Sequence, residues 1–187
     1  MHEGPEVRTS RLVLRRWRED DREPFAKLNT DPVVMERFPY LLTRAESDAF
    51  VDRIEAGFEE RGYGLRAVEV PGVAAFIGFV GLNPATFEAH FTPALEVGWR
   101  LDQPYWWAGY ATEGGRAALA FAFAELGEQE VVSFTSVGHT RSRAVMERLG
   151  MTRDPDEDFE HPNVPEGHPV RPHVLYRIDR RTWEQRG

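Results

Sequence analysis

One stretch limits the possible folds more than any other: a glycine turn that leads directly into a long helix of small and apolar residues. It reads PYWWAGYATEGGRAALAFAFAELG, from Pro104 to Gly127. The pattern predicts a helix over 112–126, closely preceded by a strand over 95–101. The first turn of a helix has backbone N–H groups without intrahelical partners, at the positive end of the helix dipole. The turn is therefore either a packing corner or a place where a phosphate binds.

The rest of the chain predicts an α+β (α/β) sheet with helices on both faces. Thr43-Arg44-Ala45-Glu46 matches a capping box, and Gly150 is a helix stop. Gly98, inside a strand, suggests a bulge or the close approach of another group. The expected strands are 11–17, 65–70, 75–82, 95–101, 131–136 and 173–178. The expected helices are 19–28, a short one from Asp31-Pro32, 43–61, 112–126 and 140–149. The segment 151–168 is expected to be a loop that holds one short strand.

Composition excludes several classes of protein. The 187 residues carry a formal net charge of −8, which argues against a nucleic-acid partner. No apolar run reaches the ~18 residues that a membrane span needs, so no membrane partner is expected. Cysteine is absent, which excludes disulfides and a cysteine nucleophile and fits a cytoplasmic protein. The histidines show no tight or helical spacing, so no metal is expected.

Charge is also uneven along the chain. Arginines cluster near the start, and acids cluster near the end. The plain interpretation of each cluster is solvated surface. The clusters are Arg8, Arg11, Arg15, Arg16 and Arg18, and Asp154, Asp156, Glu157, Asp158 and Glu160.

Several motifs together resemble a known family. The strand EVGW, the turn W-x-x-G-Y-A-T-E and the helix SRAVMERLGM look like the GNAT superfamily of acyl-CoA N-acyltransferases. The opening TSRLVLRRW with DPVVMERFP looks like its RimJ/RimL-type branch, and FEHPNVPEGHPVRPHVLYRI looks like a bacterial subgroup of it. The resemblance runs from about Thr9 to Ile178. It implies one N-acetyltransferase domain over 1–187, with its core at about 9–178.

That resemblance implies a GNAT-like mixed, mostly antiparallel central sheet, with acetyl-CoA as cosubstrate in the cleft between splayed central strands. The amides of the glycine turn would hold the pyrophosphate, and the strand before it would run beside the pantetheine arm. The residues expected to contact acetyl-CoA are Val97, Gly98, Trp99, Leu101, Trp107, Ala108, Gly109, Tyr110, Ala111, Thr112, His139 and Ser142.

The chain departs from the family pattern at two positions. Trp106 stands where the family often has Arg or Gln, which costs little because backbone amides do the holding. His139 stands where the family often has Asn, while Ser142 matches. A neutral histidine can donate and accept, as an Asn amide can. A contact between His139 and acetyl-CoA is therefore compatible with the substitution.

Acetyl transfer from a thioester to an amine needs a base for the amine proton and an acid for the leaving thiolate. The resemblance implies Glu96 as the base, directly or through water, and Ser142 as the acid. The alternatives are a structural strand carboxylate for Glu96 and a helix-start hydroxyl for Ser142. Glu160, His161 and His173 are rival site residues. No covalent enzyme intermediate is needed, which suits a chain without cysteine.

The acceptor is expected to be a primary amine, either a peptide N-terminus or a small molecule. An α-amino group, with a pKa near ~7.7–8.0, is partly neutral at pH 7, whereas a lysine at ~10.4 is almost fully charged. Expected substrate-binding residues are Phe38, Tyr40, Glu160 and His161, and the acidic loop 154–160 either attracts a cationic acceptor or is solvated. Family analogy alone suggests a homodimer. The competing hypothesis is a non-catalytic acyl-CoA-binding sensor or partner module with the same fold.

Overall fold

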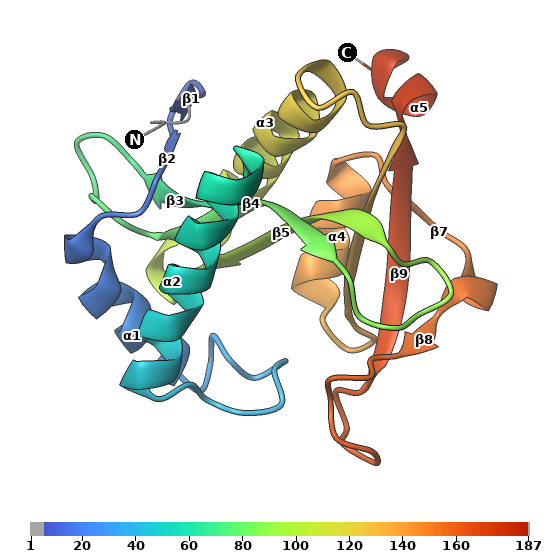
Figure 1. Ribbon diagram of the computed structural model, residues 1–187, viewed down its shortest axis with the longest axis horizontal. Coiled ribbons are helices and arrows are strands. Elements are labelled where there is room, and N and C mark those ends of the chain that lie inside the picture. Colours follow the sequence, from blue (N-terminus) through green and yellow to red (C-terminus); the bar gives the residue numbers. More distant parts are fainter. Residues whose placement is uncertain (1–5, 187) are drawn as a thin grey trace.

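A mixed sheet organises the chain, and one pair of neighbouring strands in it is parallel. The computed structural model describes residues 6–186. In that range the strand order is β1-β2-β3-β4-β5-β6-β9-β7, and β8 also pairs with β9. Every neighbouring pair is antiparallel except β5 and β6. Helices lie on both faces, so the predicted GNAT-like fold is confirmed (Figure 1).

The strands are β1 (Val7–Arg8), β2 (Val13–Arg15), β3 (Leu65–Glu69), β4 (Gly78–Ala85), β5 (Ala94–Leu101), β6 (Glu130–Ser136), β7 (Thr152–Arg153), β8 (Phe159–Glu160) and β9 (Pro172–Asp179). The helices are α1 (Arg22–Thr30), α2 (Arg44–Arg61), α3 (Tyr110–Ala124), α4 (Thr140–Arg148) and α5 (Arg180–Glu184), with 3₁₀ turns at Glu19–Asp21, Gln103–Tyr105 and Pro155–Glu157.

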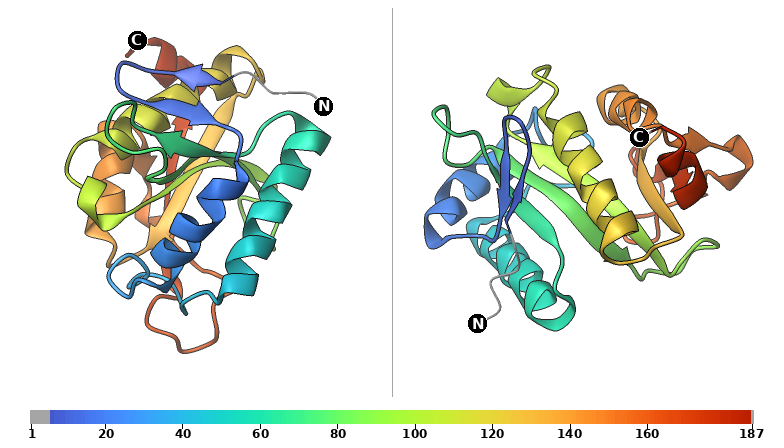
Figure 2. Two further views of the ribbon diagram at one scale, coloured as in Figure 1. Left: turned by 90° about the vertical axis from the view of Figure 1, so that its left-hand side faces the viewer. Right: turned by 90° about the horizontal axis from the view of Figure 1, so that it is seen from above.

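Different helices cover the two faces of the sheet. On one face α1 and α2 pack against β3 and β4 through a cluster that includes Phe25, Val51 and Phe79. On the other face α3 and α4 pack against β5 and β9 through a cluster that includes Leu119 and Met146. Figure 2 shows α3 crossing the sheet on the side away from α1 and α2. Both faces of the sheet are therefore buried in its middle.

Several predicted elements are confirmed, and their caps explain why. The Thr43 hydroxyl accepts from the Glu46 amide, and the Glu46 carboxylate accepts from the Thr43 amide at 2.7 Å, so the capping box begins α2. Gly109, with a φ of 83°, precedes α3, and Gly150, with a φ of 85°, follows α4. Left-handed backbone favours glycine, which is why both boundaries could be predicted.

Other expectations are wrong. No helix begins at Asp31-Pro32, because the Asp31 carboxylate accepts from the Val33 amide at 2.7 Å and holds a turn instead. The strand over 11–17 is reduced to β2, and the segment 151–168 holds two short strands rather than one. The bulge at Gly98 is absent from the described chain, because β5 runs in unbroken register along β4 from Ala94 to Leu101.

The irregularity near Gly98 lies on the other edge of β5. There β5 pairs with β6 at a single position, Glu96 opposite Val132. One residue later the Ser133 hydroxyl donates to the Val97 carbonyl at 2.9 Å, where a ladder bond would otherwise be expected. The two central strands separate beyond this point, which opens the sheet.

The arginine cluster near the start is not simply solvated. Arg15 is only 2% exposed, and its guanidinium binds Asp21 at 2.7 Å and Glu69 at 3.0 Å. Arg16 pairs with Glu55. These ion pairs tie β2 to α2, to β3 and to the turn that precedes α1.

The buried pair of Arg15 with Asp21 gives the first prediction. Arg15→Met leaves the Asp21 carboxylate buried without its cation, so it should lower the free energy of unfolding by about 3–5 kcal/mol. Urea unfolding followed by circular dichroism measures this. The matched control is Arg8→Met, because Arg8 pairs with Glu6 while its side chain is 67% exposed. A loss for Arg15→Met no larger than the loss for Arg8→Met would contradict the prediction.

Candidate active site

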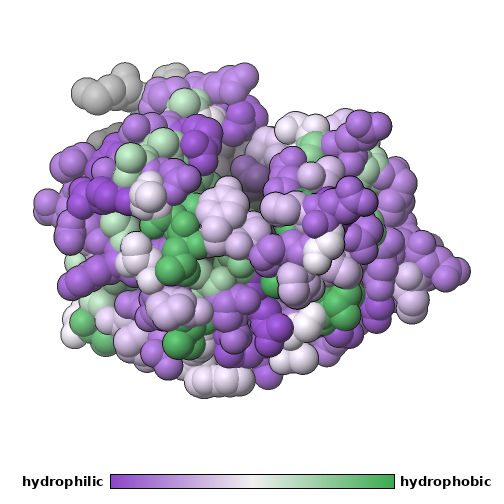
Figure 3. Space-filling view, turned by 90° about the horizontal axis from the view of Figure 1, so that it is seen from below, coloured by the Kyte–Doolittle hydropathy of each residue, from purple (hydrophilic) through white to green (hydrophobic). Residues whose placement is uncertain are grey.

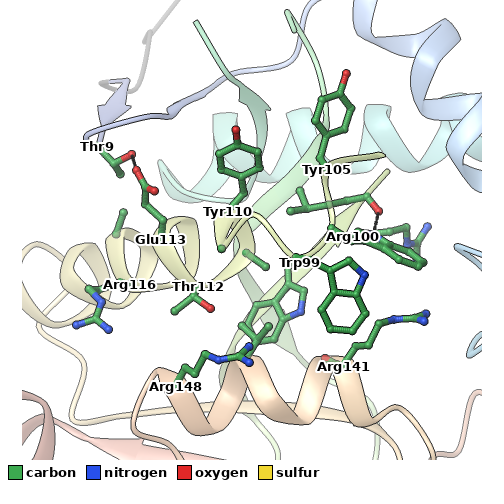
Figure 4. Close-up of a pocket in the computed structure, with 18 of the residues that line it drawn as sticks. Thr9, Trp99, Arg100, Tyr105, Tyr110, Thr112, Glu113, Arg116, Arg141 and Arg148 are labelled. Carbon is green, nitrogen blue, oxygen red and sulfur yellow. Dashed lines mark hydrogen bonds between the residues drawn. The ribbon is translucent and has the colours of Figure 1, made fainter. Parts of the chain in front are cut away.

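A cavity of about 840 Å³ opens where β5 and β6 separate. It is bounded by α3 up to Ala120, by α4, by the end of β5, by the loop after α1 and by Thr9 and Ser10 near the N-terminus (Figure 4). Its volume lies in the usual range for a ligand pocket. The lining residues are Thr9, Ser10, Val34, Phe38, Trp99, Arg100, Leu101, Tyr105, Trp106, Trp107, Gly109, Tyr110, Ala111, Thr112, Glu113, Arg116, Ala117, Ala120, His139, Arg141, Ser142, Val145 and Arg148.

The glycine turn forms one wall of the cavity. Two residues of this turn have left-handed backbone, Gly109 at a φ of 83° and Trp107 at a φ of 65°. A Cβ on Gly109 would meet only the Arg11 guanidinium, at 3.4 Å. The wall is therefore open to a ligand at the start of α3, where the helix amides are unpaired.

The two tryptophans of the turn have different environments. Trp106 packs against two core clusters, and its indole N–H donates to the Leu101 carbonyl at 2.7 Å. Trp107 is 83% exposed and lines the cavity. Trp106 thus anchors the turn to the end of β5, whereas Trp107 is left free on its surface.

The N-terminal segment holds this turn in place. The Arg11 guanidinium donates to the Ala108 carbonyl at 2.9 Å and to the Glu113 carboxylate at 2.7 Å. Glu113 also accepts from the hydroxyls of Thr9 and Ser10. Burial opposes the charged form of Glu113, but these hydrogen bonds outweigh it and lower its pKa. The first turn of α3 is therefore clamped by a carboxylate and an arginine far apart in sequence.

The edge of β5 forms a second wall. Alternate residues of a strand direct their backbone groups to the same edge, so Val97, Trp99 and Leu101 face the gap. The Val97 carbonyl accepts from Ser133 and the Leu101 carbonyl from Trp106. Gly98 faces β4 through its backbone, opposite Gly81. Trp99 is therefore the middle position from which the strand backbone can reach a ligand in the cavity.

The start of α4 forms a third wall. Ser142, a residue of the first turn of α4, is buried and lines the cavity. His139 lies at the N-cap, and its Nδ1 is 2.9 Å from the Thr135 hydroxyl. Burial, with Arg141 and Arg37 nearby, lowers the pKa of His139 to about 4. The ring is therefore neutral near pH 7, so its other nitrogen can donate or accept.

Glu96 lies at the point where β5 and β6 separate. On the other edge of β5 it is directly opposite Asn83 of β4. Burial raises the pKa of its carboxyl to about 8, although a hydrogen bond with Asn83 acts in the opposite direction. Its Oε1 lies 3.5 Å from where a Cβ of Gly98 would be. The carboxyl therefore extends over Gly98, on the face of β5 that α1 and α2 cover. Glu96 is not itself among the residues that line the cavity.

The structure separates the four expected acceptor residues. Phe38 lines the cavity and stacks on Arg100, whose guanidinium carbon lies 4.2 Å from the ring centroid. Tyr40 is 59% exposed and does not line the cavity. Figure 3 views the molecule from below and shows apolar residues in several small groups among polar ones on that face.

Glu160 and His161 lie in and after β8, outside the cavity lining. Glu160 pairs with Arg171 at 3.1 Å, and His161 packs 4.5 Å from Phe87 and 4.9 Å from His173, measured between ring centroids. Three of the other four acids of loop 154–160 also have local partners. Glu157 pairs with Arg177, Asp158 pairs with Arg153, and Asp154 accepts from the Asp156 amide. Arginines therefore neutralise Glu157, Asp158 and Glu160, whereas Asp154 and Asp156 form no ion pair among the described residues.

Four cavity arginines were not expected from the sequence: Arg100, Arg116, Arg141 and Arg148. In Figure 4 Arg116 extends from α3, and Arg141 and Arg148 extend from α4. Arg141 also pairs with Glu36 at 2.7 Å and so joins α4 to the loop after α1. Strand alternation places Arg100 on the same face as Glu96, which was a signal in the sequence.

The residues described by the structure contain no cluster of three or more histidines and acids that could hold a metal ion. Within residues 6–186, no helix is both long and apolar enough to cross a membrane.

Comparison with known proteins decides the family. The family model of the acetyltransferase (GNAT) domain matches residues 11–152. The chain belongs to the GNAT acetyltransferase family. It is therefore an acetyltransferase that uses acetyl-CoA as the acetyl donor, and its cavity lies where GNAT-like central strands separate.

Individual relatives agree with this assignment. The FsC-acetyl coenzyme A-N(2)-transacetylase of Aspergillus fumigatus is 31% identical, over 96% of this chain and 78% of the relative. A crystal structure of an acetyltransferase from Agrobacterium tumefaciens is 26% identical, with a TM-score of 0.75, over 94% of this chain and 95% of the other.

A more distant structure shares the fold. It is RimL, a ribosomal L7/L12 alpha-N-protein acetyltransferase in complex with coenzyme A, at 16% identity and a TM-score of 0.74. The match covers 94% of this chain and 98% of RimL.

The low pKa of His139 gives a prediction for the stability of this GNAT protein in acid. Its pKa is about 4 in the folded state, against an ordinary histidine value of 6.5, so the unfolded chain binds this proton first. Stability should therefore fall as the pH drops from about 6.5 towards 4. His139→Gln should weaken this dependence, measured as urea midpoints across that range. An unchanged pH dependence in the variant would contradict the assignment of this effect to His139.

Proposed function

We propose that this protein is an N-acetyltransferase which transfers acetyl directly from acetyl-CoA to a primary amine in a ternary complex. The observation that carries the proposal is the cavity at the gap between β5 and β6, with an open glycine turn on one wall and Glu96 beside the gap. The names of two relatives support a nitrogen acceptor, since one is an N(2)-transacetylase and RimL is an alpha-N-protein acetyltransferase. We also propose that the chain forms one acetyltransferase domain.

The proposed donor site uses three walls of the cavity. Amides of the turn from Trp107 to Thr112 hold the pyrophosphate, because small residues let phosphate oxygens approach the start of α3. The backbone of Trp99 binds the pantetheine arm. His139 and Ser142 contact the donor from the start of α4. Arg116 and Arg148 add positive charge beside a cosubstrate that carries several phosphate charges.

The proposed reaction forms one bond and breaks another. The neutral amine attacks the thioester carbon, a C–N bond forms, and the C–S bond breaks. Glu96 takes the amine proton, directly or through water, and Ser142 gives a proton to the leaving thiolate. A carboxylate with a pKa of about 8 is a stronger base than an ordinary glutamate, which suits an acceptor with an α-amine pKa near ~7.7–8.0.

Two classes of primary amine are candidates for the acceptor. The RimJ/RimL-type likeness favours a peptide N-terminus, whereas the name of the A. fumigatus relative gives a nitrogen acceptor without its class, so a small amine is the alternative. Phe38 lies on the acceptor side of the gap in either case. A cytoplasmic location and a homodimer stay predictions from the sequence.

The turn can be tested with a pair of matched glycines. Gly109→Ala should weaken acetyl-CoA binding at least about tenfold, because a Cβ would occupy the open wall where the pyrophosphate is proposed to bind and would strain left-handed backbone. Gly62→Ala is the control, because Gly62 has a φ of 79° with nothing within 4 Å and lies at the end of α2. Isothermal titration of acetyl-CoA measures both. Equal affinity in the two variants would argue against pyrophosphate binding at the turn.

Glu96 can be tested by its pH dependence. If it is the base, kcat/KM should rise with a midpoint near pH 8 and level off above about pH 9, and Glu96→Gln should lower kcat/KM about 10²–10⁴-fold and remove that step. The measurement uses two acceptor amines with different pKa values. A rise caused by Glu96 should occur at the same pH with both amines, whereas a rise caused by ionisation of the amine should shift with the pKa of the amine. The control is Glu88→Gln, at an exposed position in the loop after β4. A pH step that survives in Glu96→Gln would exclude this role.

The function itself is tested by release of free thiol from acetyl-CoA with a panel of amines. Release that depends on the amine supports the transferase. Thermal stabilisation by acetyl-CoA with no thiol release for any amine would instead support the non-catalytic acyl-CoA-binding module.

A further inference from the structure

Arg100 is a charged residue of the cavity that the proposed reaction does not use. It lies in β5 on the face covered by α1 and α2, and it lines the cavity. Its guanidinium carbon is 4.2 Å from the ring centroid of Phe38, 5.5 Å from that of Phe79 and 5.7 Å from that of Phe50. In Figure 4 it lies on the side of the cavity away from Arg116 and α3. Arg100 therefore belongs to the acceptor side rather than the donor side.

Arg100 has no counter-ion in the part of the chain that the structure describes. Its one hydrogen bond there runs from Nη1 to the amide oxygen of Asn29, at 2.6 Å, and Nε is buried without a partner. Burial lowers the pKa of the guanidinium to about 10, so the group is still charged at pH 7. Arg15, by contrast, is buried against two carboxylates. Arg100 as a whole is half-buried, and a charge partly removed from water is costly unless it is paired, so a ligand could supply the partner that Arg100 lacks.

Glu96 and Arg100 lie on either side of Gly98 in β5, and the glycine forms a floor without a side chain between them. Both side chains lie on the same face of β5, with Gly98 between them. Within 4 Å of a Cβ placed on Gly98 only the Glu96 carboxyl is met, so no other side chain crowds that point. Two strand residues span about 7 Å, which is the approximate distance along β5 from Gly98 to Arg100. A ligand lying on this floor can present one end to Glu96 and the other to Arg100.

We propose that Arg100 binds a carboxylate of the acceptor, so that the acceptor is a primary amine which also carries a carboxylate. This rests on the proposed N-acetyltransferase function and names the substrate class of the same site. The planar guanidinium binds carboxylates through paired hydrogen bonds, and the rings of Phe38, Phe50 and Phe79 keep it away from water. The amine then lies towards Glu96, at the gap between β5 and β6.

A purely structural role for Arg100 makes a different prediction. Holding Asn29 and Phe38 in place would affect all acceptors alike, whether or not they carry a carboxylate. Arg66 offers a matched comparison, because its Nη1 and Nη2 are buried without partners and it lies 5.3 Å from the ring centroid of Phe58. Arg66 does not line the large cavity. It should therefore affect folding without affecting the choice of acceptor.

The experiment measures kcat/KM by thiol release from acetyl-CoA for paired acceptors. One arm uses free amino acids from glycine to 6-aminohexanoate, each beside its carboxamide. The second arm uses short peptides with amidated C-termini, with an acidic or an amide side chain near the free N-terminus. The enzymes are wild type, Arg100→Gln, Arg100→Lys and Arg66→Gln, and titration with acetyl-CoA checks that each still binds the donor.

The wild type should prefer the carboxylate in at least one arm by about ten- to hundredfold. Arg100→Gln should lower kcat/KM for the carboxylates at least about tenfold more than for the carboxamides and so lose this preference, Arg100→Lys should keep part of it, and Arg66→Gln should keep it fully. Equal use of both members of every pair by the wild type, or an equal loss for both in Arg100→Gln, would overturn the inference and leave the transferase standing. Donor binding without thiol release for any amine would overturn the proposed function, and this inference with it.

Discussion

The separation of β5 from β6 is the constraint on which the rest of the site depends. The two strands are parallel neighbours, yet they share only the pair Glu96 and Val132. A continuous ladder there would fill the space with backbone hydrogen bonds and leave no cavity. The Ser133 hydroxyl satisfies the Val97 carbonyl where the ladder ends, so the separation leaves that group paired. Glu96 lies at this point, and the cavity opens beyond it.

Charge within the cavity runs opposite to the charge of the whole chain. The protein has a net charge of −8, whereas the cavity is lined by Arg100, Arg116, Arg141 and Arg148. Glu113, which also lines it, is bound by Arg11, so little of its charge faces a ligand. An anionic donor therefore meets a favourable potential inside a protein whose surface is negative. Net charge alone would have pointed the other way.

Local patterns predicted much of the fold, because caps and glycines act over a few residues. The Thr43 capping box, Gly109 and Gly150 marked helix ends that the structure confirms. The failures came where side chains competed with the backbone or met distant partners. Asp31 made a turn rather than a helix, and Arg15 found Asp21 and Glu69 instead of solvent. Gly98 did mark a special position, because the Glu96 carboxyl lies over it. It does not form a bulge, since β5 stays in register with β4.

The sequence alone determined the order of elements, the glycine turn before a long helix and the likeness to the GNAT family. These depend on periodicity, left-handed backbone and short motifs, all of which are properties of neighbouring residues. Only the folded chain brought Arg11 and Glu113 to one turn, placed Phe38 on Arg100, and moved Glu160 and His161 away from the cavity. Such contacts join residues from separate elements. They depend on how sheet and helices pack, because no local pattern specifies which distant side chains meet.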